Sequence, residues 1–300
     1  MEILRTPESC FADLPDFAWQ PTYREITDSQ GHSLRIASIE AGPADGQCVL
    51  LMHGEPSWSF LYRFMIAKLV EGGCRVVAPD LVGFGRSDKP ADTGDYTYAR
   101  HVEWMSRWFE AAELSAVTLF CQDWGGLIGL RLVAAYPERF ARVVTANTFL
   151  PTGDRPAGPA FEAWKQFSQS VPVFPVGQII QRATVRKLTD AEVAAYDAPY
   201  PEERFKAGAR IFPALVPVTP DNPEAPANRA AWEVLSGFNK PWLTLFSDQD
   251  PITKGGDQLF QKLVPGTAGQ PHHVMVGGGH FLQEDVGVEL AERMLAWFKA

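Results

Sequence analysis

The chain has 300 residues, of which 46% are hydrophobic and 21% charged, and its formal net charge is -9. That length and apolar content suffice for one large hydrophobic core, or for a core with a modest second unit. An acidic chain lacks the basic face that nucleic acid or an anionic membrane requires, so neither is expected as a partner.

The first twenty residues carry four acidic side chains and no apolar stretch typical of a signal peptide, and no apolar run could span a bilayer. We therefore expect a soluble cytoplasmic enzyme. Cysteines 10, 48, 74 and 121 show no paired spacing, and three of them lie in or beside apolar runs that suit small buried residues. The sequence predicts no disulfide and no metal site.

Strand-like and helix-like segments alternate through the first half of the chain. The predicted strands cover residues 23–26, 34–40, 48–52, 75–78, 117–120 and 142–146. The first two alternate in polarity, as antiparallel strands at a sheet edge do, whereas the third is continuously apolar, as buried parallel strands are. The predicted helices cover residues 60–69, 98–112 with Thr97 as N-cap, and the segment after residue 123. This order predicts an α/β fold with a mostly parallel central sheet flanked by helices.

The pattern changes after Leu150, where five prolines and glycines within nine residues open a region of short helical patterns without an evident strand. We interpret residues 151–226 as a helical cap domain inserted after the sixth strand, over the sheet edge where open α/β folds bind ligands. Residues 1–150 and 227–300 then form the core domain. The remaining core elements are predicted strands over 242–246 and 273–276 and predicted helices over 258–264 and 288–299.

The turn after the strand over 117–120 has the small-x-nucleophile-x-small pattern of a nucleophile elbow. Cys121 precedes the apex and Gly125 follows it, but Asp123 occupies the apex in place of serine. Small neighbours suit an elbow because its strained backbone lies close to adjacent elements. A carboxylate at a helix N-terminus stays ionised, and it can displace a leaving group from saturated carbon to form an ester. The alternative is an ordinary helix N-cap.

Two further polar side chains follow later strands, in the order nucleophile, acid, histidine found in α/β-hydrolases. His280 lies in the glycine-rich loop 277–281, and its ordinary pKa near neutrality suits a general base, with a plain surface histidine as the alternative. An acid should orient the imidazole. Asp250 is preferred over Asp248 because the residue before Pro251 is held in an extended conformation, and Asp248 stays the alternative.

Six stretches of the chain together match one known family. They are His53-Gly-Glu-Pro-Ser-Trp-Ser59, Asp80-Leu-Val-Gly-Phe-Gly-Arg-Ser-Asp-Lys-Pro90, Gln122-Asp-Trp-Gly-Gly126, Phe161-Glu-Ala-Trp164, Asp250 and Gly279-His-Phe281. With them the chain resembles a haloalkane dehalogenase of the α/β-hydrolase fold over nearly its full length. The resemblance implies a catalytic triad of Asp123, Asp250 and His280, and an oxyanion hole made by the backbone N–H groups of Glu55 and Trp124.

The implied reaction splits a carbon–halogen bond of a small haloalkane with water, through an alkyl ester of the aspartate, and releases primary alcohol, halide and a proton. It needs no cofactor. A halide leaving in a dry cavity needs hydrogen-bond donors, and indole N–H groups suit this role. Trp124 matches the family's first halide-binding tryptophan. Because Glu55 stands where some members carry a second donor, asparagine, the second donor expected here is the cap residue Trp164, with Trp232 or a mere packing role for Trp164 as alternatives.

Five phenylalanines are candidates for the wall of an apolar substrate cavity, or simply for the core of the cap: Phe161, Phe167, Phe174, Phe212 and Phe281.

Other functions stay open at this point. An epoxide hydrolase shares the Asp nucleophile but needs cap phenols to protonate the epoxide oxygen, for which Tyr196 and Tyr200 are available. A fluoroacetate dehalogenase would carry arginine where Trp124 stands. An intact triad argues against a catalytically silent binding protein on the same fold. The expected assembly is a monomer.

Overall fold

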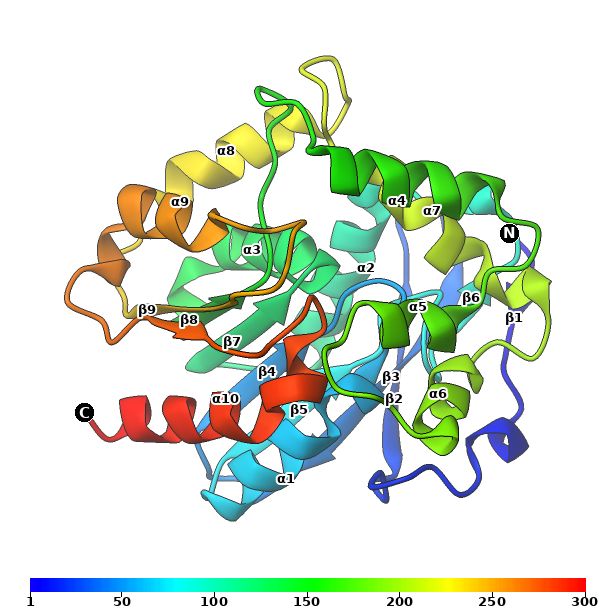
Figure 1. Cartoon of the computed structure of the whole chain (residues 1–300), viewed down its shortest axis with the longest axis horizontal. Helices are drawn as coiled ribbons and strands as arrows, with labels where there is room; N and C mark the ends of the chain where they lie inside the picture. Colours follow the sequence, from blue (N-terminus) through cyan, green and yellow to red (C-terminus); the bar gives the residue numbers. More distant parts are fainter.

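An eight-stranded sheet forms the centre of the molecule in the computed structural model, which describes residues 1–300 (Figure 1). Its strands are β2 (Pro21–Thr27), β3 (Ser33–Ala41), β4 (Cys48–Met52), β5 (Arg75–Pro79), β7 (Val117–Gln122), β8 (Phe140–Ala146), β9 (Trp242–Ser247) and β10 (His273–Met275). Their spatial order is β10-β9-β8-β7-β4-β5-β3-β2. All pairs are parallel except those of β3, which runs antiparallel to β2 and β5. The predicted mostly parallel sheet with antiparallel strands at one edge is confirmed.

Helices cover both faces of this sheet. The α-helices of the whole chain are α1 (Arg63–Glu71), α2 (Tyr98–Ala111), α3 (Trp124–Ala135), α4 (Pro159–Ser170), α5 (Val176–Arg182), α6 (Asp190–Asp197), α7 (Ala207–Leu215), α8 (Ala225–Leu235), α9 (Gly256–Leu263) and α10 (Leu282–Phe298). Helices α1 and α10 pack together on one face, and α2 and α3 pack together on the other (Figure 1). A small antiparallel pair, β1 (Ile3–Leu4) and β6 (Lys89–Pro90), lies apart from the main sheet. None of the helices has both the length and the apolarity to cross a bilayer.

Local sequence signals place most of these elements correctly. Strand β4 is buried along its whole length, as its unbroken apolar run predicts. Thr97 caps α2, because its hydroxyl accepts the N–H of Arg100 at 3.1 Å. Helix α10 differs from the prediction, since it begins at Leu282 instead of residue 288 and is kinked at Val286. Its first turn carries buried polar residues, so apolar periodicity could not reveal it.

Segment 151–226 contains α4 to α7 and the first residues of α8, and it contains no strand. It follows β8, the sixth strand of the large sheet along the chain, as predicted for the insertion. A buried ion cluster fastens it to the core: Arg63 of α1 contacts Glu192 of α6 at 2.8 Å and Glu284 of α10 at 2.6 Å. One cation thus binds a carboxylate of the inserted segment and a carboxylate of the core.

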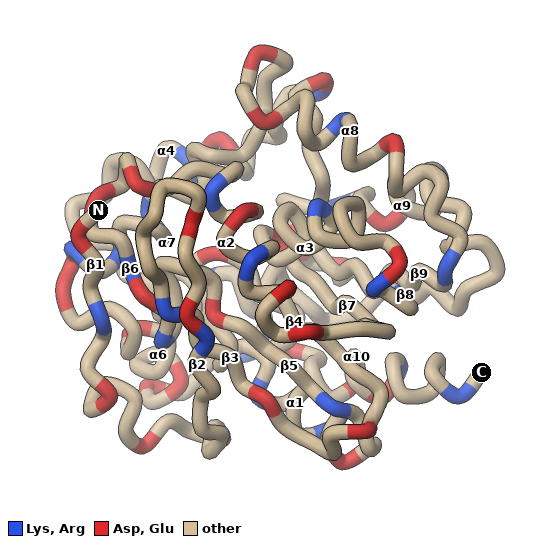
Figure 2. Tube along the Cα trace, turned by 180° about the vertical axis from the view of Figure 1, so that it is seen from behind, with Lys and Arg blue, Asp and Glu red and all other residues tan.

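Acidic and basic residues are interspersed on the side of the molecule shown in Figure 2, and Lys and Arg do not gather in one region of that side.

Candidate active site

Asp123 occupies a sharp turn between β7 and α3. Its backbone φ is 51°, in a region that L residues rarely adopt, and its N–H donates to the carbonyl of Asn147 at 2.9 Å. A side chain at Gly125 would collide with the backbone carbonyl of Met52, which explains the glycine behind the apex. The Asp123 carboxylate makes no N-cap hydrogen bond, so the alternative of an ordinary helix cap is wrong.

The Asp123 carboxylate is held from two sides. Its Oδ1 accepts the backbone N–H of Glu55 at 2.8 Å, and its Oδ2 lies 3.5 Å from Nε2 of His280. A side chain at Gly54 would overlap the carboxylate, so the loop after β4 can approach only as glycine. The backbone N–H of Trp124 has no hydrogen bond to this carboxylate in the structure, although it follows directly at the start of α3.

His280 contacts one of the two candidate acids. Its Nδ1 lies 2.9 Å from Oδ2 of Asp250, which also accepts the Thr253 hydroxyl, while Asp250 Oδ1 accepts the N–H of Ile252 at 2.9 Å. Asp248 instead accepts the N–H of Gly277 at 2.8 Å. The structure therefore brings Asp250, and not Asp248, to the imidazole.

Opposing effects set the charge of this pair. Burial lowers the pKa of His280, but the charge of Asp250 and the hydrogen bond to Asp123 outweigh it and raise the pKa to about 10. Burial raises the pKa of Asp250, but the charge and hydrogen bond of His280 lower it to about 2. Both shifts favour the ion pair between the His280 imidazolium and the Asp250 carboxylate.

Three tryptophans line the same cavity, and their indole N–H groups differ in what they bind. The Trp232 indole donates to the carbonyl of Leu150 at 2.8 Å, so its N–H is already occupied. The Trp124 indole stacks on Phe212 with ring centroids 4.4 Å apart, and its N–H donates to no protein group. Trp164 directs its indole N–H toward the carboxyl of Glu55. The Trp124 N–H therefore has no protein partner, whereas the Trp164 N–H faces the Glu55 side chain and the Trp232 N–H faces a backbone carbonyl.

Glu55 places a second carboxyl group beside Asp123. It is only 4% exposed, and its Oε1 has no hydrogen-bond partner. Burial raises its pKa well above the ordinary value, and the charge of Asp123 raises it further, against smaller effects of His280 and Trp164. Burial and the neighbouring carboxylate thus both favour the neutral form of Glu55.

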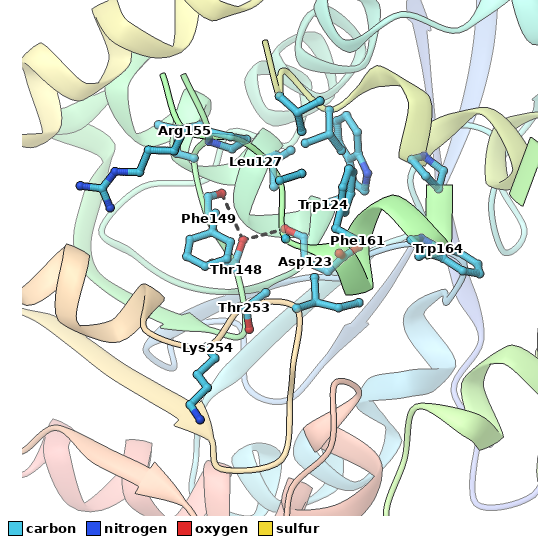
Figure 3. Close-up of a pocket in the computed structure, with 18 of the residues that line it drawn as sticks. Asp123, Trp124, Leu127, Thr148, Phe149, Arg155, Phe161, Trp164, Thr253 and Lys254 are labelled. Carbon is cyan, nitrogen blue, oxygen red and sulfur yellow. Dashed lines mark hydrogen bonds between the residues drawn. The ribbon is translucent and has the colours of Figure 1, made fainter. Parts of the chain in front are cut away.

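A cavity of about 1250 Å³ joins these groups, and its wall includes Asp123, His280, Trp124 and Trp164. In Figure 3 both indoles lie on one side of Asp123, and the charged ends of Arg155 and Lys254 lie on the other. Arg155, Arg182 and Lys254 are exposed and form part of the wall at its solvent side.

Three of the five candidate phenylalanines line this cavity: Phe161, Phe167 and Phe281. The prediction was wrong for Phe174 and Phe212, which lie behind the wall and pack against Trp164 and Trp124 respectively. Further apolar wall residues were not predicted, because no sequence pattern separates an apolar residue that lines a cavity from one in a closed core: Leu127, Ile179, Pro213, Val216 and Ile252.

The two cap tyrosines do not reach the cavity wall. Tyr196 is fully buried and its hydroxyl binds Glu284 in the ion cluster. Tyr200 is 5% exposed, and its hydroxyl has no partner. The phenolic acids that epoxide opening requires are therefore missing from the site.

Two amides beside the triad escaped sequence analysis. Gln122 lies directly before Asp123, and its Nε2 lies 3.2 Å from both the Nε2 and the carbonyl oxygen of His280. Asn147 donates to the same carbonyl at 3.1 Å. No sequence pattern marks a buried amide at the end of a strand as part of a site. Only its contact with His280 in the folded structure shows that it belongs there.

Comparison with known proteins is consistent with this geometry. A family model described as the alpha/beta hydrolase fold matches residues 47–285, so the chain is an α/β-hydrolase. It is 56% identical over 295 residues to a haloalkane dehalogenase of Psychrobacter cryohalolentis, covering 98% of this chain and 97% of that protein. A haloalkane dehalogenase of Mycolicibacterium paratuberculosis is 50% identical, covering 100% of this chain and 99% of that protein.

The solved structure of the tetrameric haloalkane dehalogenase DpaA from Paraglaciecola agarilytica superimposes with a TM-score of 0.91 at 34% identity, covering 99% of this chain and 98% of that one. The chain belongs to the haloalkane dehalogenases, hydrolases of carbon–halogen bonds, and the resemblance inferred from its motifs is confirmed.

Proposed function

We propose that this enzyme hydrolyses haloalkanes in two steps, through an ester on Asp123, with His280 and Asp250 serving the second step. The observation that carries the proposal is the alignment of these three side chains. Oδ2 of Asp123 lies 3.5 Å from Nε2 of His280, whose Nδ1 lies 2.9 Å from Asp250, at the wall of a cavity that Trp124 and Trp164 also line.

In the first step, an oxygen of Asp123 attacks the carbon that carries the halogen. The new C–O bond forms as the carbon–halogen bond breaks, and its electron pair leaves on the halide. The Glu55 N–H holds Oδ1 at 2.8 Å and leaves Oδ2 facing the cavity. Trp124 and Trp164 donate to the departing halide, which would otherwise be an unpaired buried anion.

Esterification itself prepares the second step. It removes the charge of Asp123, one of the two carboxylates that raise the pKa of His280. The pKa of His280 then falls, so the imidazolium gives its proton to solvent, which is the proton that the overall reaction releases, and the neutral imidazole can take a proton from water. Water attacks the ester carbonyl carbon, and the N–H groups of Glu55 and Trp124 stabilise the resulting oxyanion. The intermediate expels the alkoxide, which takes the proton from His280 as the alcohol leaves. Asp123 is then a carboxylic acid, and transfer of its proton to the imidazole restores the starting site.

We infer that residues 151–226 form the cap domain of this site and that residues 1–150 and 227–300 form its core. The cap contributes Trp164, Phe161 and Phe167 to the cavity wall, while Asp123 and His280 come from the core. Excluding bulk water from the chamber strengthens the charge interactions on which both steps depend.

The test is the variant His280→Gln with 1-bromobutane as substrate. Because only the second step needs the base, we expect release of about one bromide per active site and then arrest. Mass spectrometry should find a butyl group on the peptide that contains Asp123, and Asp123→Ala should release no bromide. Absence of an alkylated Asp123 peptide would contradict the proposal, and diol formation from styrene oxide by the parent enzyme would favour the epoxide hydrolase.

The assembly stays a prediction. The sequence leads us to expect a monomer, whereas the relative DpaA is described as tetrameric. Sedimentation velocity at micromolar concentration distinguishes the two states.

A further inference from the structure

The loop that carries His280 is rich in glycine, which by itself does not fix the backbone conformation. Three consecutive glycines, 277 to 279, precede the histidine, and Gly277 has a φ of 84°. Glycine samples many backbone conformations, so this loop needs external tethers. The requirement is strict because the imidazole must face Asp250 on one side and Asp123 on the other.

Asn147 supplies such a tether from the end of β8. Its side chain is fully buried, and Nδ2 donates to the carbonyls of Gly279 at 2.9 Å and His280 at 3.1 Å. Its Oδ1 accepts the N–H of Ser247, three residues before Asp250, at 2.9 Å. Its own carbonyl accepts the N–H of Asp123 at 2.9 Å. One residue therefore connects the chain segments of all three triad members.

Side chains are the only donors to these two loop carbonyls. Ser247 donates its hydroxyl to Gly279 at 2.9 Å and accepts Nδ2 of Asn147 at 2.8 Å, and Gln122 donates to the His280 carbonyl at 3.2 Å. No backbone N–H reaches either carbonyl. Asn147 itself is absent from the cavity wall, so any effect on the reaction acts through His280.

We propose that Asn147 is a positioning residue for the hydrolytic half-reaction, through its hold on the His280 loop. The inference rests on the two-step function proposed above. Alkylation uses Asp123, the Glu55 N–H and the indoles, none of which the Asn147 side chain contacts. Hydrolysis requires the imidazole to meet both water and Asp250, and small misplacements of a catalytic group are costly.

This assignment has a kinetic signature that a general structural role lacks. If only hydrolysis slows, the ester accumulates, so kcat and KM fall by the same factor while kcat/KM, which reports on alkylation, stays constant. A partly misfolded enzyme instead loses kcat and burst amplitude together at constant KM.

Asn147→Gly is the cleanest variant, because Asn147 has a φ of 38° that glycine adopts without strain, and only the amide is lost. We expect halide release in the first turnover within about threefold of the parent and hydrolysis of the ester at least about tenfold slower, with the ester trapped by acid quench. Asn147→Asp retains the shape but removes both donors, and it should show the same pattern.

Asn228→Asp is the matched control. Asn228 is also buried, and its side chain binds the carbonyl of Pro151 at 2.7 Å and the guanidinium of Arg131 at 3.0 Å, with no hydrogen bond to a triad residue or to the His280 loop. It should leave the ratio of alkylation to hydrolysis rates unchanged. If the Asn147 variants fail to fold, Ser247→Ala tests the same tether by removing one donor to Gly279.

Two outcomes would overturn the inference: hydrolysis at the parent rate in Asn147→Gly, or loss of kcat at constant KM with unreduced burst amplitude. Failure of the two-step function is separately visible, since the His280→Gln variant would then yield no ester at all.

Discussion

Replacing Asp250 with asparagine should slow hydrolysis of the ester while leaving its formation intact. The Asp250 carboxylate is 3% exposed and lies 2.9 Å from Nδ1 of His280. Asparagine has the same shape and can still accept the Nδ1 hydrogen through its carbonyl oxygen, but it carries no charge. The substitution therefore tests the charge of Asp250 separately from its role in orienting the imidazole.

The expected decrease in the rate of ester hydrolysis follows from the pKa of His280. Burial alone would lower it, yet the two carboxylates raise it to about 10. Relative to an ordinary value of about 6.5, this corresponds to on the order of 5 kcal/mol in favour of the imidazolium. Asp123 is uncharged in the ester, so Asp250 alone stabilises the imidazolium formed when water is deprotonated. If Asp250 supplies at least half of the effect, its loss costs roughly 3 kcal/mol, about 100-fold in rate.

Rapid-quench measurements with 1-bromobutane separate the two steps. The bromide burst should keep its rate and amplitude, and the alkylated Asp123 peptide should decay about 100-fold more slowly than in the parent. Asp248→Asn is the control, since Asp248 binds only the Gly277 N–H. Ester decay within about threefold of the parent in Asp250→Asn would refute the reasoning.

Three further predictions address halide binding, pH and the elbow. Trp164→Phe removes one donor to the halide, so bromide affinity measured by fluorescence quenching should fall about 10- to 100-fold, as expected for a hydrogen bond to a charged group. Trp232→Phe is the control and should leave bromide affinity within about twofold, because the Trp232 N–H is bound to Leu150. Equal losses in the two variants would count against Trp164 as the second halide donor beside Trp124. The raised pKa of His280 stabilises the folded state fully below about pH 6.5, and this contribution is lost as the pH rises toward about 10. The free energy of unfolding in urea, measured from pH 6 to 10, should show this decline in the parent and not in His280→Gln. An identical decline in both proteins would contradict the prediction. Gly125→Ala would press a methyl group into the backbone carbonyl of Met52, whereas the methyl group of Gly158→Ala meets open space. Thermal denaturation should show a free energy of unfolding lower by about 3 kcal/mol or more for the first variant and little changed for the second. Comparable melting temperatures would disprove the steric explanation.

Local patterns were sufficient for the sheet and for the elbow. Strand β4 is recognisable as an unbroken apolar run, because both of its faces are buried. Helix α2 is recognisable as a capped segment with helical periodicity, because only one of its faces is buried. The elbow combines small residues with a charged apex, a pattern that only a tight strand-to-helix turn requires. The order of motifs along the chain was enough to indicate the family.

Tertiary packing decided what such patterns do not encode. The proline after Asp250 favoured that residue but left Asp248 as an alternative, and the path of the chain after β9 brings Asp250, and not Asp248, to His280. Phe174 and Phe161 are both aromatic cap residues, and the packing of the cap around Trp164 places only Phe161 in the cavity wall.

By itself, then, the sequence determined the fold, the family and the position of the carboxylate at the elbow, because each depends on neighbours along the chain. The tertiary structure excluded the alternative acid Asp248, and it alone decided which rings line the cavity and which amide holds the histidine loop. Those choices join residues as distant as Asn147 and His280, and such contacts are specified by how whole elements pack, which no local stretch of sequence records.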